Sequence, residues 1–284
     1  MGQYAIEVDG LRKSYDEVEA LRGISFAVER GEVFGLLGPN GAGKTTTVEI
    51  LEGYRERSAG TVAVLGEDPG RRSRQLRERV GIVLQSSGFY PRVTVREAVH
   101  HWSGLYPAPR DPEEVIDVVG LREKADDQAA NLSGGQRRRL DLALALVGDP
   151  ELIFLDEPTT GFDPGARRRA WETIRSLSAL GKTILLTTHY LDEVEQLADR
   201  VAVLREGRVV AAGTVQELDG GAPATEIRYR RNGEVVVVET EEPTRVLHEL
   251  TAAAIQRGEE LDGLEVRKPS LEEVYLSLTQ AEPE

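Results

Sequence analysis

One short run of residues has the types and spacing needed to hold the phosphates of a nucleoside triphosphate. Residues 38–45 match the pattern G-x-x-x-x-G-K-[ST], and they are Gly38, Pro39, Asn40, Gly41, Ala42, Gly43, Lys44 and Thr45. Glycines allow the tight turns that aim backbone N–H groups at phosphate oxygens, and a following helix N-terminus adds partial positive charge. The lysine would reach the β- and γ-phosphates, and the threonine hydroxyl would ligate Mg²⁺.

The flanking residues predict the two elements that this motif requires. Residues 33–37 are apolar and predict a buried strand that ends at the loop. Residues 46–51 predict a helix that leaves the loop, and Thr46 at its start is counted among the predicted nucleotide-binding residues. A glycine-rich turn before an ordinary helix is the alternative, but it does not require all four fixed positions of the motif.

A second apolar run, residues 152–155, ends in two adjacent carboxylates, Asp156 and Glu157. An α/β sheet places its catalytic groups at the carboxyl ends of its strands. We expect Asp156 to hold Mg²⁺ or its water shell, and Glu157 to polarise the attacking water as a general base. Many strands end in acids, so the pair alone is weak evidence, and it indicates a catalytic site because a phosphate-binding loop lies upstream.

A second candidate anion site lies between these motifs, at residues 131–136, which read Asn-Leu-Ser-Gly-Gly-Gln. Ser133 offers a hydroxyl, and two glycines expose backbone N–H groups at the start of a predicted helix. An N-cap that only opens a helix is the alternative. In order with the other motifs, the run resembles the signature of the nucleotide-binding domain of ATP-binding-cassette (ABC) proteins. The resemblance implies a head-to-tail homodimer, in which the signature of one copy closes over the ATP of the other through Ser133, Gly134, Gly135 and Gln136.

The same resemblance assigns roles to further residues by their position. Tyr15 corresponds to an aromatic that stacks on adenine, although a tyrosine at a strand edge is also common. Gln85 corresponds to a glutamine that touches Mg²⁺ or the attacking water, with an ordinary exposed glutamine as the alternative. Asp163 corresponds to a residue that communicates across the dimer, and Phe162 beside it departs from the family pattern. His189 corresponds to the switch histidine that contacts the γ-phosphate, although a lone histidine is usually structural.

Composition limits the class of protein. No apolar run approaches the ~20 residues that span a bilayer, and the polar N-terminus lacks the apolar core of a signal peptide. The chain has no cysteine, which excludes disulfides and cysteine-based metal sites. A formal net charge of −14 argues against a broad footprint on nucleic acid. We therefore expect a soluble, intracellular protein with no nucleic-acid partner.

The elements that must position these groups follow from the patterning of the chain. Residues 1–30 predict antiparallel strands, and the motif-bearing strands, separated by helices, predict a mainly parallel core sheet. Residues 90–145 predict helices, consistent with a helical subdomain that carries the signature. The expected fold is α/β, an ABC-type P-loop nucleotide-binding domain over residues 1–218.

The pattern changes near residues 219–223, which predicts a second domain. Residues 224–284 predict a small α+β accessory domain with a hairpin around Asn232 and Gly233. Helices are expected at 243–257 and 270–278, on either side of an extended segment.

The tail, residues 268–276, resembles that of the daunorubicin/doxorubicin-resistance group of exporter ATPases. This implies the ATP-hydrolysing subunit of an ABC exporter, at the cytoplasmic face of the cell membrane and attached through a transmembrane permease subunit on a separate chain. Phe89 and Tyr90 either pack against their own domain or line a groove for a short helix of that subunit.

Two other classes of function fit the sequence less well. A soluble ABC-type ATPase acting on nucleic acid or ribosomes is the alternative, but the single cassette, the absence of an inserted coiled coil and the negative charge count against it. A P-loop kinase or GTPase would not carry the signature.

Overall fold

The computed structural model describes residues 2–83, 92–220, 225–231 and 234–267. Chain contacts divide the protein into two compact units, Met1–Ala212 and Gly213–Glu284, and each is described by itself. The domain limits expected from the sequence, 1–218 and 224–284, stay a prediction.

A six-stranded sheet forms the centre of the first unit, in the order β5-β6-β7-β3-β8-β9. The first five strands in this order are mutually parallel, which confirms the predicted core sheet. Parallel strands end at one edge, so the segments that follow β3, β6 and β7 meet there. The strands are β3 (Val33–Leu37), β5 (Val80–Val83), β6 (Leu152–Asp156), β7 (Thr183–Thr188), β8 (Arg200–Arg205) and β9 (Arg208–Thr214).

The central strands are aliphatic because both faces of the sheet are covered. Ile153 and Leu155 of β6 belong to one buried cluster, which includes residues of the helices. Leu152 and Phe154, which alternate with them, belong to a second cluster on the side of the antiparallel strands.

A three-stranded antiparallel sheet covers that second side, in the order β2-β1-β4. Its strands are β1 (Tyr4–Tyr15), β2 (Val18–Glu29) and β4 (Ala59–Val64), and α1 (Lys44–Leu51) contacts β2, β4 and β6. The predicted antiparallel strands within residues 1–30 are confirmed. β4 was not predicted, because its Ala59-Gly60 start is poor in strand-forming residues.

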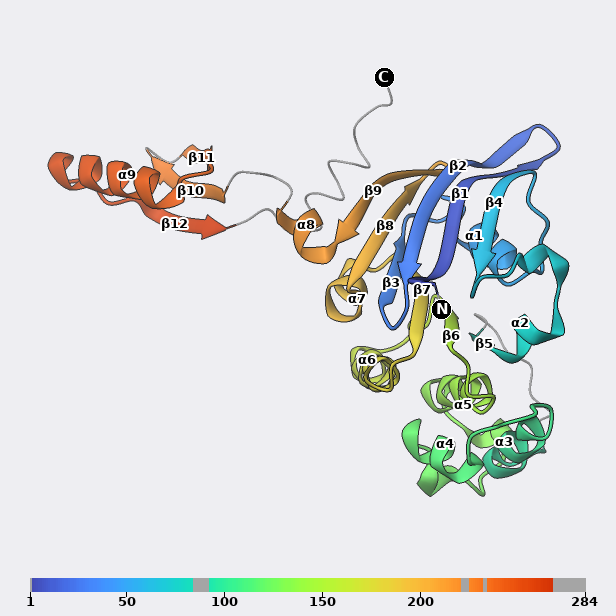
Figure 1. The fold of residues 1–284 in the computed structure, drawn as a ribbon. Helices are drawn as coiled ribbons and strands as arrows, with labels where there is room; N and C mark the ends of the chain where they lie inside the picture. The colour runs from blue at the N-terminus through green and yellow to red at the C-terminus, as the bar shows by residue number, and fades with distance from the viewer. Residues whose placement is uncertain (1, 84–91, 221–224, 232–233, 268–284) are drawn as a thin grey trace. The chain divides into compact units, whose positions relative to one another are not determined.

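The helices of the first unit include a group that packs together beyond the sheet, α3 with α4 and α5 (Figure 1). This confirms the predicted helical subdomain. The helices are α2 (Arg74–Glu78), α3 (Val95–Ser103), α4 (Pro112–Val118), α5 (Gly134–Leu146), α6 (Pro164–Ala179) and α7 (Leu191–Leu197), with short 3₁₀ turns at Pro69–Arg71, Arg122–Lys124 and Ala129–Asn131.

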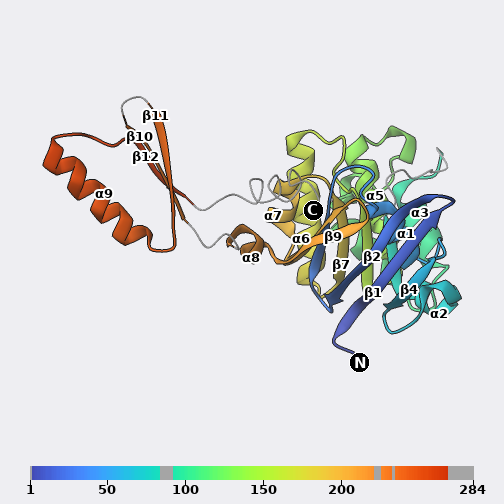
Figure 2. The ribbon, with the colours of Figure 1, turned by 90° about the horizontal axis from the view of Figure 1, so that it is seen from above.

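The second unit contains a small antiparallel sheet in the order β11-β10-β12, with α9 along one side (Figure 2). Ile227 and Tyr229 of β10 and Ala254 of α9 are buried. The predicted strands, helix and extended segment are confirmed, while Asn232, Gly233 and the helix expected at 270–278 lie outside the described residues. The elements are α8 (Val215–Gly220), β10 (Thr225–Arg231), β11 (Glu234–Thr240), α9 (Pro243–Arg257) and β12 (Asp262–Arg267).

Candidate ATP-hydrolysis site

The phosphate loop runs from the end of β3 to the start of α1, and its glycines are required by geometry. Gly43, the N-cap of α1, has a φ of 108°. A Cβ at Gly38 would lie 2.3 Å from the Leu204 carbonyl oxygen, and a Cβ at Gly43 would lie 2.7 Å from the Leu21 side chain. Only glycine fits these two positions, so the loop can expose its backbone N–H groups ahead of the helix.

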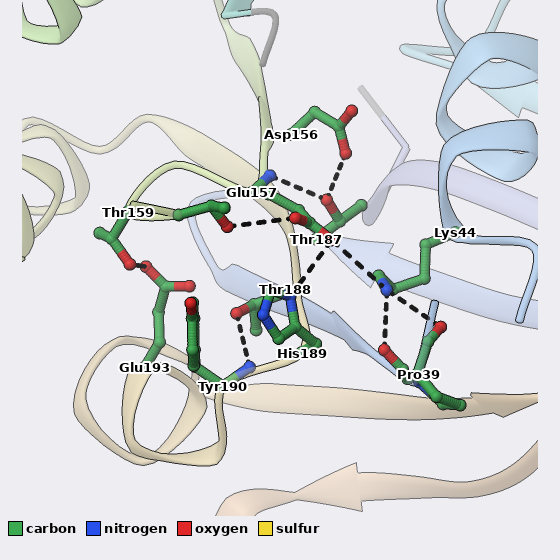
Figure 3. Close-up of polar contacts among 12 residues, drawn as sticks. Pro39, Lys44, Asp156, Glu157, Thr159, Thr187, Thr188, His189, Tyr190 and Glu193 are labelled. Atoms are coloured by element: carbon green, nitrogen blue, oxygen red, sulfur yellow. Dashed lines mark hydrogen bonds and ion pairs between the residues drawn. The ribbon is translucent and has the colours of Figure 1, made fainter. Parts of the chain in front are cut away.

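The Lys44 side chain is buried and turned onto the loop. Its Nζ donates hydrogen bonds to the carbonyl oxygens of Gly38, at 2.7 Å, and Pro39, at 3.2 Å (Figure 3). It also lies 3.6 Å from Glu157 Oε1. Burial lowers the pKa of Lys44, and the Glu157 carboxylate opposes that shift. The Lys44 amino group therefore lies between the loop and the residue that follows β6.

Asp156 and Glu157 are fixed by a hydroxyl on the neighbouring strand β7. Thr187 Oγ1 donates to Asp156 Oδ1 at 2.5 Å and accepts from the Glu157 backbone N–H at 3.0 Å. The Glu157 N–H also donates to the Thr187 carbonyl oxygen at 3.1 Å. Glu157 has a φ of 44°, a left-handed conformation that is uncommon for a residue with a side chain. This turn separates the directions of the two carboxylates.

The Glu157 carboxylate is the centre of the site. Oε1 lies 3.3 Å from His189 Nδ1 and 3.6 Å from Lys44 Nζ, and Oε2 accepts a hydrogen bond from Thr160 Oγ1 at 3.1 Å. The side chain is 14% exposed, compared with 30% for His189. A carboxylate held between a cation and an imidazole in a partly dry site can accept a proton from a bound water. The structure thus brings Lys44, Glu157 and His189 together from three motifs.

His189 is packed within a second group of side chains. Its ring lies 4.0 Å from the ring of Tyr190, and Arg167 Cζ lies 4.6 Å from the Tyr190 ring. Arg167 Nη1 also donates to Asp192 Oδ2 at 2.8 Å. This stack fixes the orientation of the segment that carries the histidine.

The signature residues open α5 through a reciprocal capping box. Ser133 Oγ accepts from the Gln136 N–H at 3.3 Å, and Gln136 Oε1 accepts from the Ser133 N–H at 2.9 Å. Ser133 and Gly134 are exposed. They line a cavity of about 510 Å³ together with Phe162 and Asp163, and no phosphate-loop residue is among the described residues of its lining.

The remaining predicted residues take separate positions. Asp163 caps α6, because its carboxylate accepts the N–H groups of Gly165 and Ala166, and the bond from Ala166 is the main reason its pKa is lowered. Tyr15 ends β1, and Lys13 Nζ and Arg55 Cζ lie 5.0 and 5.1 Å from its ring centroid. An adenine on this ring would share it with a cation or displace one.

Three predicted residues remain to be placed. Thr45 is exposed in the first turn of α1, and Thr46 follows it half-buried. Gln85 lies outside the described residues.

Two residues of the site were not predicted from sequence, Thr187 and Thr159. Thr187 lies at the carboxyl end of a strand, where an α/β sheet places functional groups, and that position could have identified it. Thr159 is fully buried and donates to Glu193 at 2.9 Å, a contact that only the fold reveals.

Comparisons with known proteins identify the family of the chain. The family model described as ABC transporter matches residues 21–160. The Nod factor export ATP-binding protein I of Rhizobium sp. (strain N33) is 41% identical, over all of both chains. The daunorubicin resistance ATP-binding protein DrrA3 of Streptomyces coeruleorubidus is 37% identical, over 98% of this chain and 97% of that protein.

Solved structures give the same fold. The ATP-binding subunit of an ABC transporter superposes with a TM-score of 0.71 at 25% identity, covering 96% of this chain and 99% of that chain. The ADP conformation of MJ1267, an ATP-binding cassette of an ABC transporter, superposes with a TM-score of 0.67, covering 76% and 93%. Since a relative is 41% identical over the whole of both chains, the chain belongs to the ABC transporter family, as an ATP-binding and ATP-hydrolysing subunit.

Proposed function

We propose that this chain powers export through a separate transmembrane permease subunit, by binding and hydrolysing ATP at the Lys44–Glu157–His189 site. The observation that carries the proposal is that Lys44 Nζ and His189 Nδ1 both lie within 3.6 Å of Glu157 Oε1. Among the residues that the structure describes, no helix is both long and apolar enough to cross a membrane. The pathway for cargo is therefore assigned to a partner, which would hold this subunit at the cytoplasmic face of the membrane.

The residues present fit a magnesium ion held jointly with the nucleotide. Thr45 offers an exposed hydroxyl, and the Asp156 carboxylate lies near enough to Lys44 to oppose, together with Glu157, the lowering of the Lys44 pKa by burial. Hard oxygen ligands of this kind suit Mg²⁺, which commonly takes only one or two protein ligands beside phosphates and waters. Within the described ranges, no group of three or more His, Cys, Asp or Glu could hold a metal alone. Bound Mg²⁺ would neutralise phosphate charge, and Gln85 is the further proposed contact.

The chemistry assigned to this chain's own residues is water activation. Glu157 would accept the proton of the attacking water, since its Oε1 faces both Lys44 and His189. Lys44 would leave the Gly38 and Pro39 carbonyls for the β- and γ-phosphates, and His189 would contact the γ-phosphate.

We further propose that two copies act as a head-to-tail dimer. Ser133 and Gly134 are exposed at the N-terminus of α5, and the described lining of their cavity contains no residue of the phosphate loop of the same chain. The ATP of a second copy would complete this site, with Asp163 at the seam between copies.

A groove in the first unit is the proposed docking site for the permease. It has a volume of about 1120 Å³ and lies between the end of α1, α2 and β5 on one side and α3 and α5 on the other. Aromatic side chains line it, among them Tyr54, which is 64% exposed, Trp102, which is 39% exposed, and Tyr106. Aromatic anchors of this kind are enriched at the centres of protein interfaces. Phe89 and Tyr90, expected here from sequence, lie outside the described residues.

Trp102→Asp should weaken association with the permease, because a charge would enter the apolar wall of the groove. We expect co-purification with the transmembrane permease subunit to fall about tenfold or more, while ATP hydrolysis by the isolated subunit stays near wild type. Leu180→Asp, at an exposed leucine that does not line the groove, is the matched control. Undiminished co-purification and transport by Trp102→Asp would place the partner elsewhere.

Glu52 in the same groove makes the stability of the nucleotide-free protein depend on pH. Burial, the nearby Asp156 carboxylate and Glu49 raise the pKa of Glu52 from 4.5 to about 8. Ionisation of this acid therefore opposes folding, and stability present at low pH is lost as pH rises from 4.5 to about 8. The Glu52→Gln side chain cannot ionise. The melting temperature of this variant relative to wild type should therefore increase by about 3 °C or more as the pH rises from about 5 to about 9.

Thermal unfolding without nucleotide or Mg²⁺ measures this difference, with Glu17→Gln, at an exposed turn, as the control. Parallel pH dependences for wild type and Glu52→Gln would show that this carboxyl ionises normally in the fold.

A further inference from the structure

Glu193 is a fully buried acid that belongs to none of the motifs described above. It lies in the first turn of α7, four residues after His189, and is 0% exposed. Its Oε1 accepts a hydrogen bond from Thr159 Oγ1 at 2.9 Å (Figure 3). The same oxygen accepts a hydrogen bond from Trp171 Nε1 at 3.4 Å. The carboxyl therefore joins three segments that are separate in the sequence.

Each of these segments carries a group of the proposed catalytic cycle. Thr159 is two residues after Glu157, in a turn where the Phe162 N–H donates to the Thr159 carbonyl oxygen at 3.1 Å. Trp171 belongs to α6, the helix that Asp163 caps. Glu193 itself follows His189 on α7. One side chain thus connects the catalytic carboxylate, the switch histidine and the proposed dimer seam.

The burial of Glu193 has an energetic cost that packing alone does not explain. Burial raises its pKa, and the hydroxyls of Thr188 and Thr159 and the Trp171 indole oppose that shift. Its Oε2 is buried without a hydrogen-bond partner among the described side chains. A hydrophobic side chain of similar size would avoid this desolvation, as replacements of buried charged groups in other proteins show. The acid therefore contributes something other than stability.

We propose that Glu193 is a positioning residue that couples His189 to Glu157 and to the segment leading to Asp163, through the hydrogen bonds from Thr159 and Trp171. Closure at the Asp163 seam would then move the Glu157 turn and the histidine together. This rests on the proposed function only in that ATP hydrolysis is one of its readouts. Small displacements of a catalytic group are costly, so the loss of this connection should appear mainly in kcat.

Two pairs of variants test the proposal. Glu193→Leu and Thr159→Val remove the acceptor and the donor, and each should lower kcat about tenfold or more while the KM for ATP changes less than about twofold. Glu193→Gln and Thr159→Ser keep the hydrogen bond and should retain most of the wild-type kcat. Because the two losses share one interaction, the double variant Glu193→Leu/Thr159→Val should lose no more than the worse single variant.

Thr251→Val is the matched control, since the Thr251 hydroxyl donates only within α9, to the carbonyl oxygens of Leu247 at 2.6 Å and His248 at 3.2 Å. A merely structural role would instead lower the melting temperature and raise KM together. If Glu193→Leu fails to fold, the Thr159→Val and Thr159→Ser pair decides the outcome. Wild-type kcat in Thr159→Val, or additive losses in the double variant, would overturn the proposal.

Hydrogen exchange gives a readout that does not depend on activity. Protection of residues 157–163 should fall in Thr159→Val and remain in Thr159→Ser. If the wild-type chain hydrolysed no ATP, the proposed function would fail, and exchange in this segment would still decide the role of Glu193. Unchanged protection of residues 157–163 in Thr159→Val would refute the positioning role of Glu193.

Discussion

Glu157→Gln is expected to lower the turnover of ATP roughly 10²-fold or more and to leave ATP binding intact. Glutamine keeps the size of the side chain and can still accept a hydrogen bond from Thr160. It removes the negative charge that faces Lys44 at 3.6 Å and the oxygen that could take a proton beside His189 at 3.3 Å. Because ATP then binds without being consumed, the closed dimer should accumulate.

Size-exclusion chromatography with MgATP measures that accumulation, and a phosphate-release assay measures turnover. In the Glu157→Gln background, Ser133→Arg supplies the control, because a bulky cation at the exposed α5 N-terminus should prevent closure onto the second copy. The double variant should bind ATP and remain a monomer. Hydrolysis at the wild-type rate by Glu157→Gln would move the general base to another residue, and a dimer that forms despite Ser133→Arg would contradict the head-to-tail arrangement.

The phosphate loop and the ends of β6 and β7 could be predicted from sequence, because each follows a short aliphatic run. Strands of a parallel sheet end at one edge, so Lys44, Glu157 and His189 were expected near one another. The structure adds how they meet. Lys44 contacts Glu157 directly, and the Thr187 hydroxyl bonds both the Asp156 carboxylate and the backbone N–H of Glu157.

Contacts that depend on tertiary packing could not be predicted. Residues 192–195 read Asp-Glu-Val-Glu, a charged pattern typical of a solvated helix face, yet Glu193 is fully buried. The fold buries it because Thr159 and Trp171 supply donors from distant parts of the chain. Sequence spacing records the period of a helix but not which of its polar side chains finds a partner.

The groove could not be predicted either, because it is formed by segments that are distant in the sequence. The groove combines the end of α1 with α2, β5, α3 and α5, segments that lie up to about ninety residues apart along the chain. Trp102 and Tyr106 belong to no motif in the sequence, and only the groove that they line together with Tyr54 makes them a candidate interface.

Lys44→Ala should weaken ATP binding by about 100-fold or more. The variant removes a cation whose hydrogen bonds to phosphate are charge-assisted, an effect of about 3 kcal/mol in a buried site. It also leaves Glu157 without the nearest positive charge, so two anionic groups, the carboxylate and the γ-phosphate, would face each other. The fold should survive, because the side chain contacts the loop and Glu157 rather than either apolar cluster.

Isothermal titration with ATP measures this loss, and circular dichroism checks that the variant is folded. Lys182→Ala is the matched control, since Lys182 also forms an ion pair, with Asp149 at 2.8 Å, but outside the site. Loss of binding in Lys44→Ala with retention in Lys182→Ala would tie affinity to the phosphate loop rather than to net charge. A binding isotherm that Lys44→Ala leaves unchanged would mean that the nucleotide phosphates are held elsewhere, and the assignments of Glu157 and His189 would lose the substrate that gives them their roles.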